Sequence, residues 1–241
     1  MEKEINLIID WIRDYVKKSG AKGVVIGNSG GKDSAVVIAL CVKALGQKNV
    51  LTIAMPCSSI SQDLEDAKLV ADTFGVKMLT VDLSSVYKNL CLEIEGQIID
   101  DIAPYTSINI RPRLRMITLY AIAQQNNFLV AGTGNKCEQY IGYTTKWGDN
   151  ASDFNPIGEF TVSEVLEIGK ILGVPATIIN KAPNDGLGLG SDEEKIGVRY
   201  NEIEEYILTG KTKDKASAGK IEKMHSQSEH KRKPIPIYHR K

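Results

Sequence analysis

Apolar positions along the chain follow two periods, which separate expected helices from expected strands. Ile5, Ile8, Ile12 and Val16 recur at helical spacing, so the first segment should form an amphipathic helix that Gly20 ends. Short apolar runs at residues 24–26, 50–55, 76–81 and 128–131 are typical of buried strands. Helices are expected from the end of a glycine-rich turn to about residue 45, from a cap at 61 to 74, from 84 to about 98, through 113–121, from a capping box at Thr161 and Glu164 to Gly173, and near 200–208.

This alternation of strands with helices predicts an α/β fold with a doubly wound, mainly parallel sheet and helices on both faces. We expect a single domain over residues 1–241, although the length alone also allows two. Right-handed crossovers place the first three strands side by side in chain order. If the fourth strand returns to the other side of the first, a crevice opens between them at their carboxyl ends, where such sheets bind ligands.

Charge and cysteine content narrow the class of protein. The 30 Lys and Arg residues balance the 30 Asp and Glu residues, so the composition gives no electrostatic sign of a nucleic-acid partner. The four cysteines are scattered without a C-x-x-C pair, which argues against structural zinc and a disulfide framework. The N-terminus lacks a signal-peptide core and no apolar run reaches membrane-spanning length, so we expect a cytoplasmic protein with no membrane partner.

A glycine-rich stretch follows the first expected strand and opens the next helix. It consists of Gly27, Asn28, Ser29, Gly30, Gly31, Lys32, Asp33 and Ser34, and we call residues 27–34 the cradle. Backbone N–H groups at such a turn and helix start form a site for phosphate oxygens, and the side chains of Ser29, Lys32 and Ser34 add donors. Asp33 would repel a phosphate unless a cation lies between them, so we expect Mg²⁺ to bridge Asp33 and the phosphates.

The cradle differs from the two common nucleotide-binding motifs. Three residues instead of four separate Gly27 from Gly31, and Asp33 follows the lysine where the common loop needs Ser or Thr. The three spaced glycines of the dinucleotide fingerprint are also missing. The string Ser-Gly-Gly-Lys-Asp-Ser instead resembles the SGGxDS loop of the ATP pyrophosphatases, which bind the β- and γ-phosphates of ATP and release pyrophosphate.

A second group of motifs follows the fourth expected strand. Residues 132–138 are Gly-Thr-Gly-Asn-Lys-Cys-Glu, and residues 142–153 are Gly-Tyr-Thr-Thr-Lys-Trp-Gly-Asp-Asn-Ala-Ser-Asp. These strings resemble the GT…E and GxxTKxGDxxxD motifs of the ammonia-dependent NAD synthetases. Shorter strings of that family recur in order at 181–183, 191–194, 197–200 and 229–232, so the resemblance spans roughly residues 23–233.

The resemblance implies a reaction in which nicotinic acid adenine dinucleotide (deamido-NAD), ATP and ammonia give NAD, AMP and pyrophosphate through an acyl-adenylate. It implies that Asp33 and Glu138 bind Mg²⁺. It also implies an ATP site formed by Gly27, Asn28, Ser29, Gly30, Gly31, Lys32, Ser34, Thr133 and Asn184, and a deamido-NAD site formed by Arg113, Lys146, Asp153, His230 and Lys231. We add Asp149 as a candidate catalytic residue that positions ammonia or accepts its proton.

The resemblance also bears on assembly and on the nitrogen source. The family is homodimeric, so we expect a homodimer. Val86, Leu90, Ile94 and Ile98 recur every four residues and fit either part of such an interface or the core. No residues remain here for an amidase domain, so the donor should be free ammonia or ammonia from a separate subunit.

Two positions depart from the family pattern. Val162 stands where many members have a lysine that contacts ATP phosphates, and Asn184 stands where Ser or Thr is usual. We expect weaker ATP affinity unless Lys32, Lys136 or Lys170 supplies the missing charge. Asn keeps a donor and an acceptor, so its effect should be smaller.

Two segments are expected to move. The glycine-rich stretch at 184–195 has the composition of a lid that orders over the substrates, and the segment near 211–228 should be flexible and solvated.

The sequence leaves two other interpretations open. One is a different ATP pyrophosphatase, either a tRNA-modifying or a GMP-forming adenylating enzyme. The other is a non-catalytic sensor of adenine nucleotides on the same fold, because a fold does not fix a function. The tRNA-modifying enzymes usually carry paired cysteines or a basic surface, and a sensor has no need of the motifs at 142–153.

Overall fold

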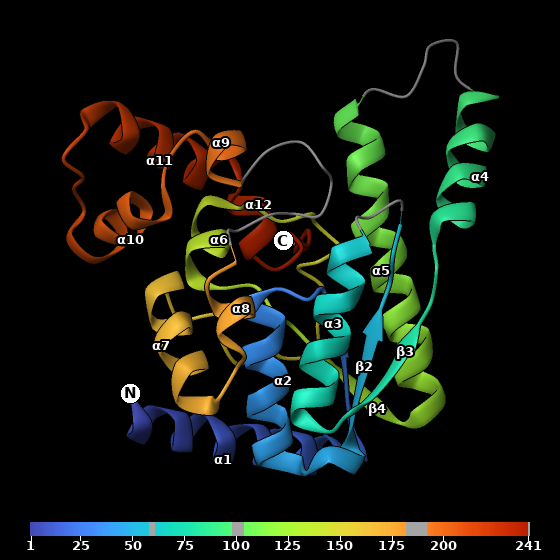
Figure 1. The fold of residues 1–241 in the computed structure, drawn as a ribbon. Helices are drawn as coiled ribbons and strands as arrows, with labels where there is room; N and C mark the ends of the chain where they lie inside the picture. The colour runs from blue at the N-terminus through green and yellow to red at the C-terminus, as the bar shows by residue number, and fades with distance from the viewer. Residues whose placement is uncertain (58–60, 98–103, 182–191, 241) are drawn as a thin grey trace.

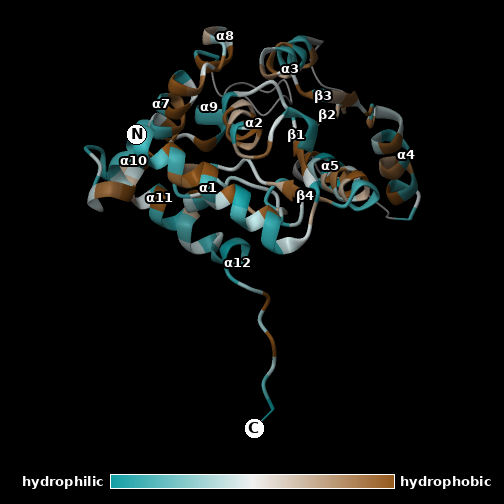
Figure 2. Ribbon diagram, turned by 90° about the horizontal axis from the view of Figure 1, so that it is seen from below, coloured by the Kyte–Doolittle hydropathy of each residue, from teal (hydrophilic) through white to brown (hydrophobic). Residues whose placement is uncertain are grey.

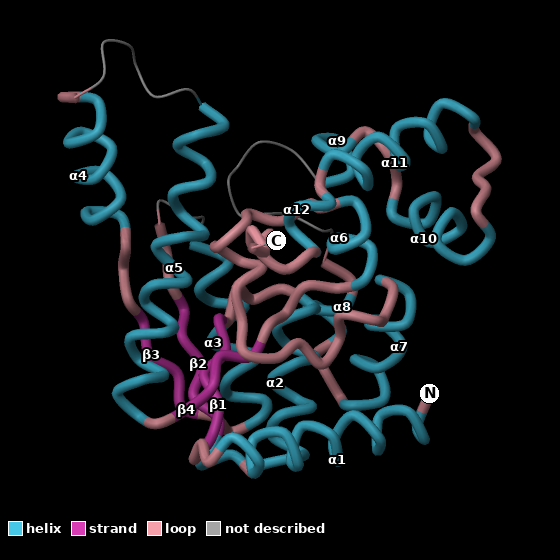
Figure 3. Tube along the Cα trace, turned by 180° about the vertical axis from the view of Figure 1, so that it is seen from behind, coloured by secondary structure: helices cyan, strands magenta, loops and turns pink. Residues whose placement is uncertain are grey.

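The computed structural model describes residues 1–57, 61–97, 104–181 and 192–240. Within these residues, four strands form one sheet: β1 (Gly23–Gly27), β2 (Val50–Ala54), β3 (Lys77–Thr80) and β4 (Phe128–Ala131). Their order is β3-β2-β1-β4 and every neighbouring pair is parallel (Figure 1 and, from behind, Figure 3). The predicted fold class and the predicted strand order are both confirmed.

Helices cover both faces of this sheet, as Figure 1 shows. One face carries α1 (Glu2–Ser19), α2 (Lys32–Leu45), α3 (Ser61–Phe74), α7 (Val162–Leu172) and α8 (Ala176–Ile179), which share the largest apolar cluster. The other face carries α5 (Pro104–Asn126), with α4 (Ser84–Glu95) packed beside it. Val24, Val25 and Ile26 of β1 are all fully buried, as expected for a central parallel strand covered on both faces.

The C-terminal part of the chain forms a small helical lobe around α6 (Lys136–Ile141) (Figures 1 and 3). The lobe contains α9 (Asp192–Ile196), α10 (Tyr200–Thr209), α11 (Lys215–Gln227) and α12 (Glu229–Arg232). Ile203 and Ile221 are fully buried in it, so α10 and α11 are packed elements. The sequence pattern did not predict α11, and the flexibility expected near 211–228 stays a prediction. Beyond α12, the chain extends away from the body in Figure 2.

Helix α4 lies at the periphery and has no buried residue. Val86 is 48% exposed and Leu90 is 38% exposed, so the core alternative is wrong for these two side chains. Ile94 is half-buried, and Ile98 lies outside the described residues. Among the described helices, none combines the length and apolarity that crossing a bilayer requires.

Candidate active site

The crevice predicted between β1 and β4 is present as a cavity of about 850 Å³. The cradle, apart from Gly30, lines one side of it, and Gly132, Thr133, Gly134 and Glu138 line the other. The two segments lie 100 residues apart in the chain and meet because β1 and β4 are parallel neighbours. The prediction that they face each other across one crevice is confirmed.

Side-chain bonds and one close contact fix the shape of the cradle. Asn28 is buried; its Nδ2 donates to the carbonyl of Ala67 at 2.8 Å, and its Oδ1 accepts from the N–H of Gly30 at 3.2 Å. Gly30 has φ +73°, and a Cβ there would lie 2.7 Å from the carbonyl oxygen of Asp63. Only glycine combines that backbone angle with that approach to α3. These contacts therefore fix the backbone path of the loop.

The cradle also presents two hydroxyls to the cavity. Ser29 Oγ lies 3.1 Å from Ser34 Oγ and accepts from the N–H of Gly31 at 3.2 Å. Both side chains line the cavity, close to the start of α2. Hydroxyls and free N–H groups at a helix N-terminus together form a site suited to an anion.

Two carboxylates are brought together at the floor of the cavity. Asp33 Oδ1 accepts from Asn135 Nδ2 at 3.2 Å, and Glu138 Oε2 accepts from the N–H of Asn135 at 2.9 Å. Asn135 and Glu138 also form the capping box that starts α6. Burial first, and then the charge of Asp33, raise the pKa of Glu138 above its usual range. The shared partner Asn135 and the raised pKa of Glu138 both fit two carboxylates that bind one cation between them.

A third acid lies near the far wall of the cavity. Asp149 Oδ1 accepts from the N–H of Thr145 at 2.6 Å, and burial raises the pKa of this carboxyl. Lys231 also lines the cavity and donates to the carbonyls of Gly142 at 2.7 Å and Thr144 at 2.6 Å. Burial lowers the pKa of Lys231, while the charge of Asp149 acts in the opposite direction.

Three other predicted substrate residues form a separate group near the surface, which we call the surface trio: Arg113, Lys146 and His230. Arg113 Nε donates to the carbonyl of Lys146 at 3.3 Å, and Lys146 Nζ lies 3.4 Å from His230 Nδ1. Lys146 Nζ also lies 5.5 Å from the ring centre of Trp147, which is 52% exposed. Among the described residues, none of the trio is part of the cavity wall. The structure thus gathers the trio but separates it from the carboxylate pair.

Asp153, predicted to contact deamido-NAD, lies elsewhere, along β4. Its Oδ2 accepts from the N–H of Val130 at 2.7 Å, and Tyr120 donates to its Oδ1 at 3.4 Å. Asn184 and residues 184–191 of the expected lid lie outside the described residues, while 192–195 belong to α9.

The presence of valine in place of the family's lysine at position 162 has a structural counterpart. Val162 is only 8% exposed and packs with Ile196, Val198, Tyr200 and Ile203. Of the three lysines considered as replacements, only Lys32 lines the cavity. Lys136 pairs with Glu159 at 3.3 Å, and Lys170 lies in the last turn of α7.

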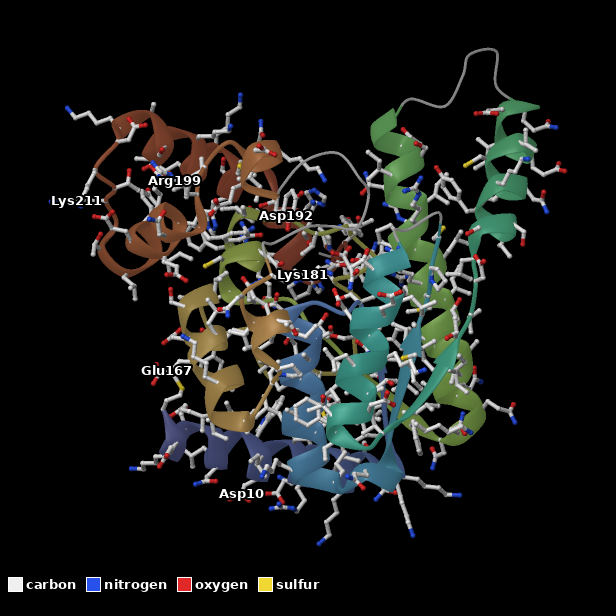
Figure 4. The ribbon with its side chains drawn as sticks, in the orientation of Figure 1. Asp10, Glu167, Lys181, Asp192, Arg199 and Lys211 are labelled. Carbon is white, nitrogen blue, oxygen red and sulfur yellow. The ribbon has the colours of Figure 1, made fainter. Side chains whose placement is uncertain are left out.

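Sequence reasoning missed several cationic residues of the cavity wall. Arg115 of α5 donates through Nε to the carbonyl of Met55 at 3.2 Å, and burial lowers its pKa. Lys181 Nζ lies 2.9 Å from Asp63 and 2.6 Å from Asp66, which joins the end of α8 to the start of α3 (Figure 4). The only sequence signal for Lys181 is its position in the 181–183 string that resembles the family. The only one for Arg115 is its closeness to Arg113.

Comparison with known proteins decides which group this site belongs to. The family model described as NAD synthase matches residues 4–235. The chain belongs to the NAD synthase family. The NH(3)-dependent NAD(+) synthetase of Carboxydothermus hydrogenoformans is 40% identical over 233 residues, covering 96% of this chain and 95% of that protein. The enzyme of the same name from Finegoldia magna is 42% identical over 224 residues, covering 92% and 90%.

Solved structures of this family share the fold of the chain. The NMN synthetase from Francisella tularensis has a TM-score of 0.92 and 36% identity, with 98% of each chain covered. The NH3-dependent NAD synthetase from Campylobacter jejuni has a TM-score of 0.80 and 29% identity, covering 99% of this chain and 98% of that one. The sequence-based predictions of the NAD synthase family and of a ligase are confirmed. The matches favour that interpretation over another ATP pyrophosphatase or a nucleotide sensor.

Proposed function

We propose that this member of the NAD synthase family converts deamido-NAD, ATP and ammonia into NAD, AMP and pyrophosphate. The observation that carries the proposal is the pairing of the phosphate cradle with the Asp33–Glu138 carboxylates in one cavity. In the first step, a carboxylate oxygen of the nicotinate attacks the α-phosphorus of ATP, and the bond to pyrophosphate breaks. In the second step, ammonia attacks the acyl carbon, AMP leaves, and the amide nitrogen loses its extra proton.

The cradle binds and orients the nucleotide in this proposal. Its N–H groups and the hydroxyls of Ser29 and Ser34 hold the two phosphates that leave, and Thr133 contacts ATP from the opposite side of the cavity. The nicotinate is already ionised at neutral pH, so no base is needed to activate it. Alignment of two anions is therefore the main task of these residues.

The carboxylates of Asp33 and Glu138 fit a magnesium ion, because hard divalent cations prefer carboxylate oxygens and the two acids carry one more charge than the ammonium group of Lys32 that is paired with Asp33. No group of three or more His, Cys, Asp or Glu side chains suited to a metal occurs among the described residues, so phosphate oxygens would supply the remaining ligands. When bound, the ion neutralises the charge that develops on the leaving pyrophosphate.

Asp149 is the residue that we propose positions ammonia or accepts its proton when the amide forms. Desolvation raises the pKa of its carboxyl where it lines the cavity, which favours acceptance of a proton. Lys231 lies beside the same wall and would hold deamido-NAD through its ammonium group. The surface trio and Asp153 would bind the remainder of the dinucleotide.

We also propose that the protein acts as a cytoplasmic homodimer supplied with free or separately delivered ammonia. The exposed Val86, Leu90 and Leu92 of α4, together with Ile117 of α5, support an interface on that side of the molecule. The assignment of this face stays a prediction, and sedimentation of the full chain tests the dimer.

The experiment that tests the function is product analysis with ATP, Mg²⁺, ammonium and deamido-NAD. The proposal expects NAD, AMP and pyrophosphate in equal amounts, and expects Asp33→Ala to abolish all three. Formation of AMP and pyrophosphate without NAD would support the adenylation step but show that deamido-NAD is not the acceptor substrate. Binding of ATP without cleavage would favour the sensor interpretation.

A second candidate is amidation of the deamido form of nicotinamide mononucleotide (NMN). The observation in its favour is the TM-score of 0.92 to the NMN synthetase from Francisella tularensis. The same cavity would serve, because the reacting carboxylate and ATP are unchanged and only the adenylate half is missing. The ratio of kcat/KM for the mononucleotide and the dinucleotide, measured with one enzyme preparation, separates the two candidates.

A further inference from the structure

Lys32 occupies an unusual position for a lysine. It is the first residue of α2 and is only 8% exposed, with its side chain in the cavity. Burial disfavours a charged ammonium, and the N-terminus of a helix disfavours a cation. Two general effects therefore oppose a lysine at this position, and something in the site must compensate for both.

The compensation comes from acids in the cavity. Lys32 Nζ lies 2.9 Å from Asp33 Oδ2, in a pair whose side chains are 9% and 18% exposed. Consecutive residues on a helix do not normally face each other, so helix geometry alone does not produce this contact. Burial by itself lowers the pKa of Lys32, but Asp33, followed by Glu138 and Asp192, raises it above the ordinary value.

Asp192 lines the same cavity from a separate element, α9. Asp192 begins α9, is 7% exposed, and accepts a hydrogen bond from Tyr143 at 3.3 Å (Figure 4). Lys32 is thus paired with Asp33 of α2, and the charges of Glu138 of α6 and Asp192 of α9 also act on its ammonium group. It is the ammonium ion directly paired with the proposed metal ligand Asp33.

We propose that Lys32 is a built-in counter-ion that competes with the divalent cation for the Asp33–Glu138 pair. The inference rests on the proposed role of these carboxylates as metal ligands. With no nucleotide present, the ammonium group neutralises the pair and keeps metal affinity low. When ATP enters, its phosphate oxygens attract the ammonium group, which a flexible four-carbon stem allows to move. The carboxylates are then released for the cation, so ATP and metal strengthen each other's binding.

The test measures binding of Mn²⁺, as a spectroscopic probe, to the full chain without nucleotide, by electron paramagnetic resonance. The proposal expects Lys32→Gln to bind Mn²⁺ at least about tenfold more tightly than the parent, which corresponds to about 1.4 kcal/mol. In the same variant, binding of ATP without metal should weaken. Opposite changes for the two ligands distinguish a counter-ion from a residue that only supports the fold.

Lys136→Gln is the matched control. Lys136 starts α6, as Lys32 starts α2, but it pairs with Glu159 at 3.3 Å and its side chain is 35% exposed. Its removal changes the net charge equally without touching the Asp33–Glu138 pair. Lys32→Met provides a second variant of similar length, and thermal unfolding confirms that each protein is folded.

Three results would overturn the proposal: unchanged or weaker Mn²⁺ binding in both Lys32 variants, an equal gain in Lys136→Gln, or a gain that persists when Asp33→Asn is added. The last result would show that the metal binds elsewhere. These binding measurements need no turnover. They therefore test the role of Lys32 even if the acceptor substrate is not deamido-NAD. Failure of the proposed function appears in the product assay instead.

Discussion

The floor of the cavity is a pair of carboxylates and the surface trio is a group of basic side chains, and the fold organises the two differently. Asp33 and Glu138 are tied to each other through Asn135, which itself is fully buried at the start of a capped helix. Arg113, Lys146 and His230 are linked by single contacts of 3.3 and 3.4 Å at the surface. The floor is therefore preorganised by the fold, whereas the trio needs a ligand to fix it. Chemistry and substrate selection should respond separately to mutation.

The largest effect should come from the floor. Glu138→Gln retains an acceptor for the N–H of Asn135 but removes the charge, so we expect kcat to fall about 10²–10³-fold with the fold intact. Glu164→Gln is the matched control, because Glu164 closes the capping box of α7 with the same geometry, at 2.8 Å. Pyrophosphate release measures both. Equal activity in the two variants would contradict the role of Glu138.

The next effect concerns the shape of the cradle. Gly30→Ala should reduce kcat/KM about 100-fold, or 2.7 kcal/mol, because its Cβ would collide with backbone atoms of α3 and displace the loop. Gly20→Ala is the control: its φ is +74°, against +73° for Gly30, and nothing lies within 4 Å of its Cβ. That variant should lose about 1 kcal/mol of stability and no activity. If Gly30→Ala and Gly20→Ala had similar kcat/KM values, the shape of the cradle would not matter for catalysis and the prediction would be wrong.

A smaller effect should come from the surface trio. Lys146→Ala removes a half-buried cation near the surface, so we expect KM for deamido-NAD to rise about tenfold with kcat little changed. The deamido mononucleotide should show a smaller change if the trio contacts the part that it lacks. Steady-state kinetics with both substrates gives the comparison. A fall in kcat alone would mean that the trio acts in the chemical step.

The smallest effect is one of stability. Burial raises the pKa of Asp149, so the folded state holds its proton more tightly than the unfolded state does. The stability that this group contributes is complete below the unfolded pKa of about 3.9 and is lost as the pH rises through the folded value. Asp149→Asn should therefore become more stable relative to the parent as the pH rises from about 4 toward 7. Urea unfolding at several pH values checks this, and a constant difference would contradict it.

The parts of the site that the sequence predicted are those fixed by backbone topology. Strand order follows from crossover handedness, and strand order alone brings the cradle opposite Thr133 and Glu138. Gly30 could be placed at the turn because its position after β1 and before α2 leaves few other backbone paths. For the cradle and the segment after β4, the local sequence pattern and the sheet topology predict the same arrangement.

The parts that it missed depend on contacts between distant segments. Asp153 Oδ2 accepts from the N–H of Val130 at the outer edge of β4, where Phe154 forms a parallel bridge with Ala131, and no sequence motif marks this contact. Helix α11 was missed because its apolar stripe is narrow, with Ile221 fully buried among charged neighbours. The pairing of Lys32 with Asp33 was hidden because consecutive helical residues ordinarily diverge.

Helix α6 has six residues, too few to be stable alone, and a capping box holds its first turn. Both bonds in that box involve Glu138, one through its carboxylate and one through its backbone N–H, and the capping side chain of Asn135 also donates to Asp33. Unwinding of one helical turn therefore dismantles the acidic pair at the same moment. The amide hydrogen of Glu138, which donates to Asn135 Oδ1, should consequently exchange with solvent only when the site itself opens. The exchange rate of this one amide would then report how often the assembled site opens.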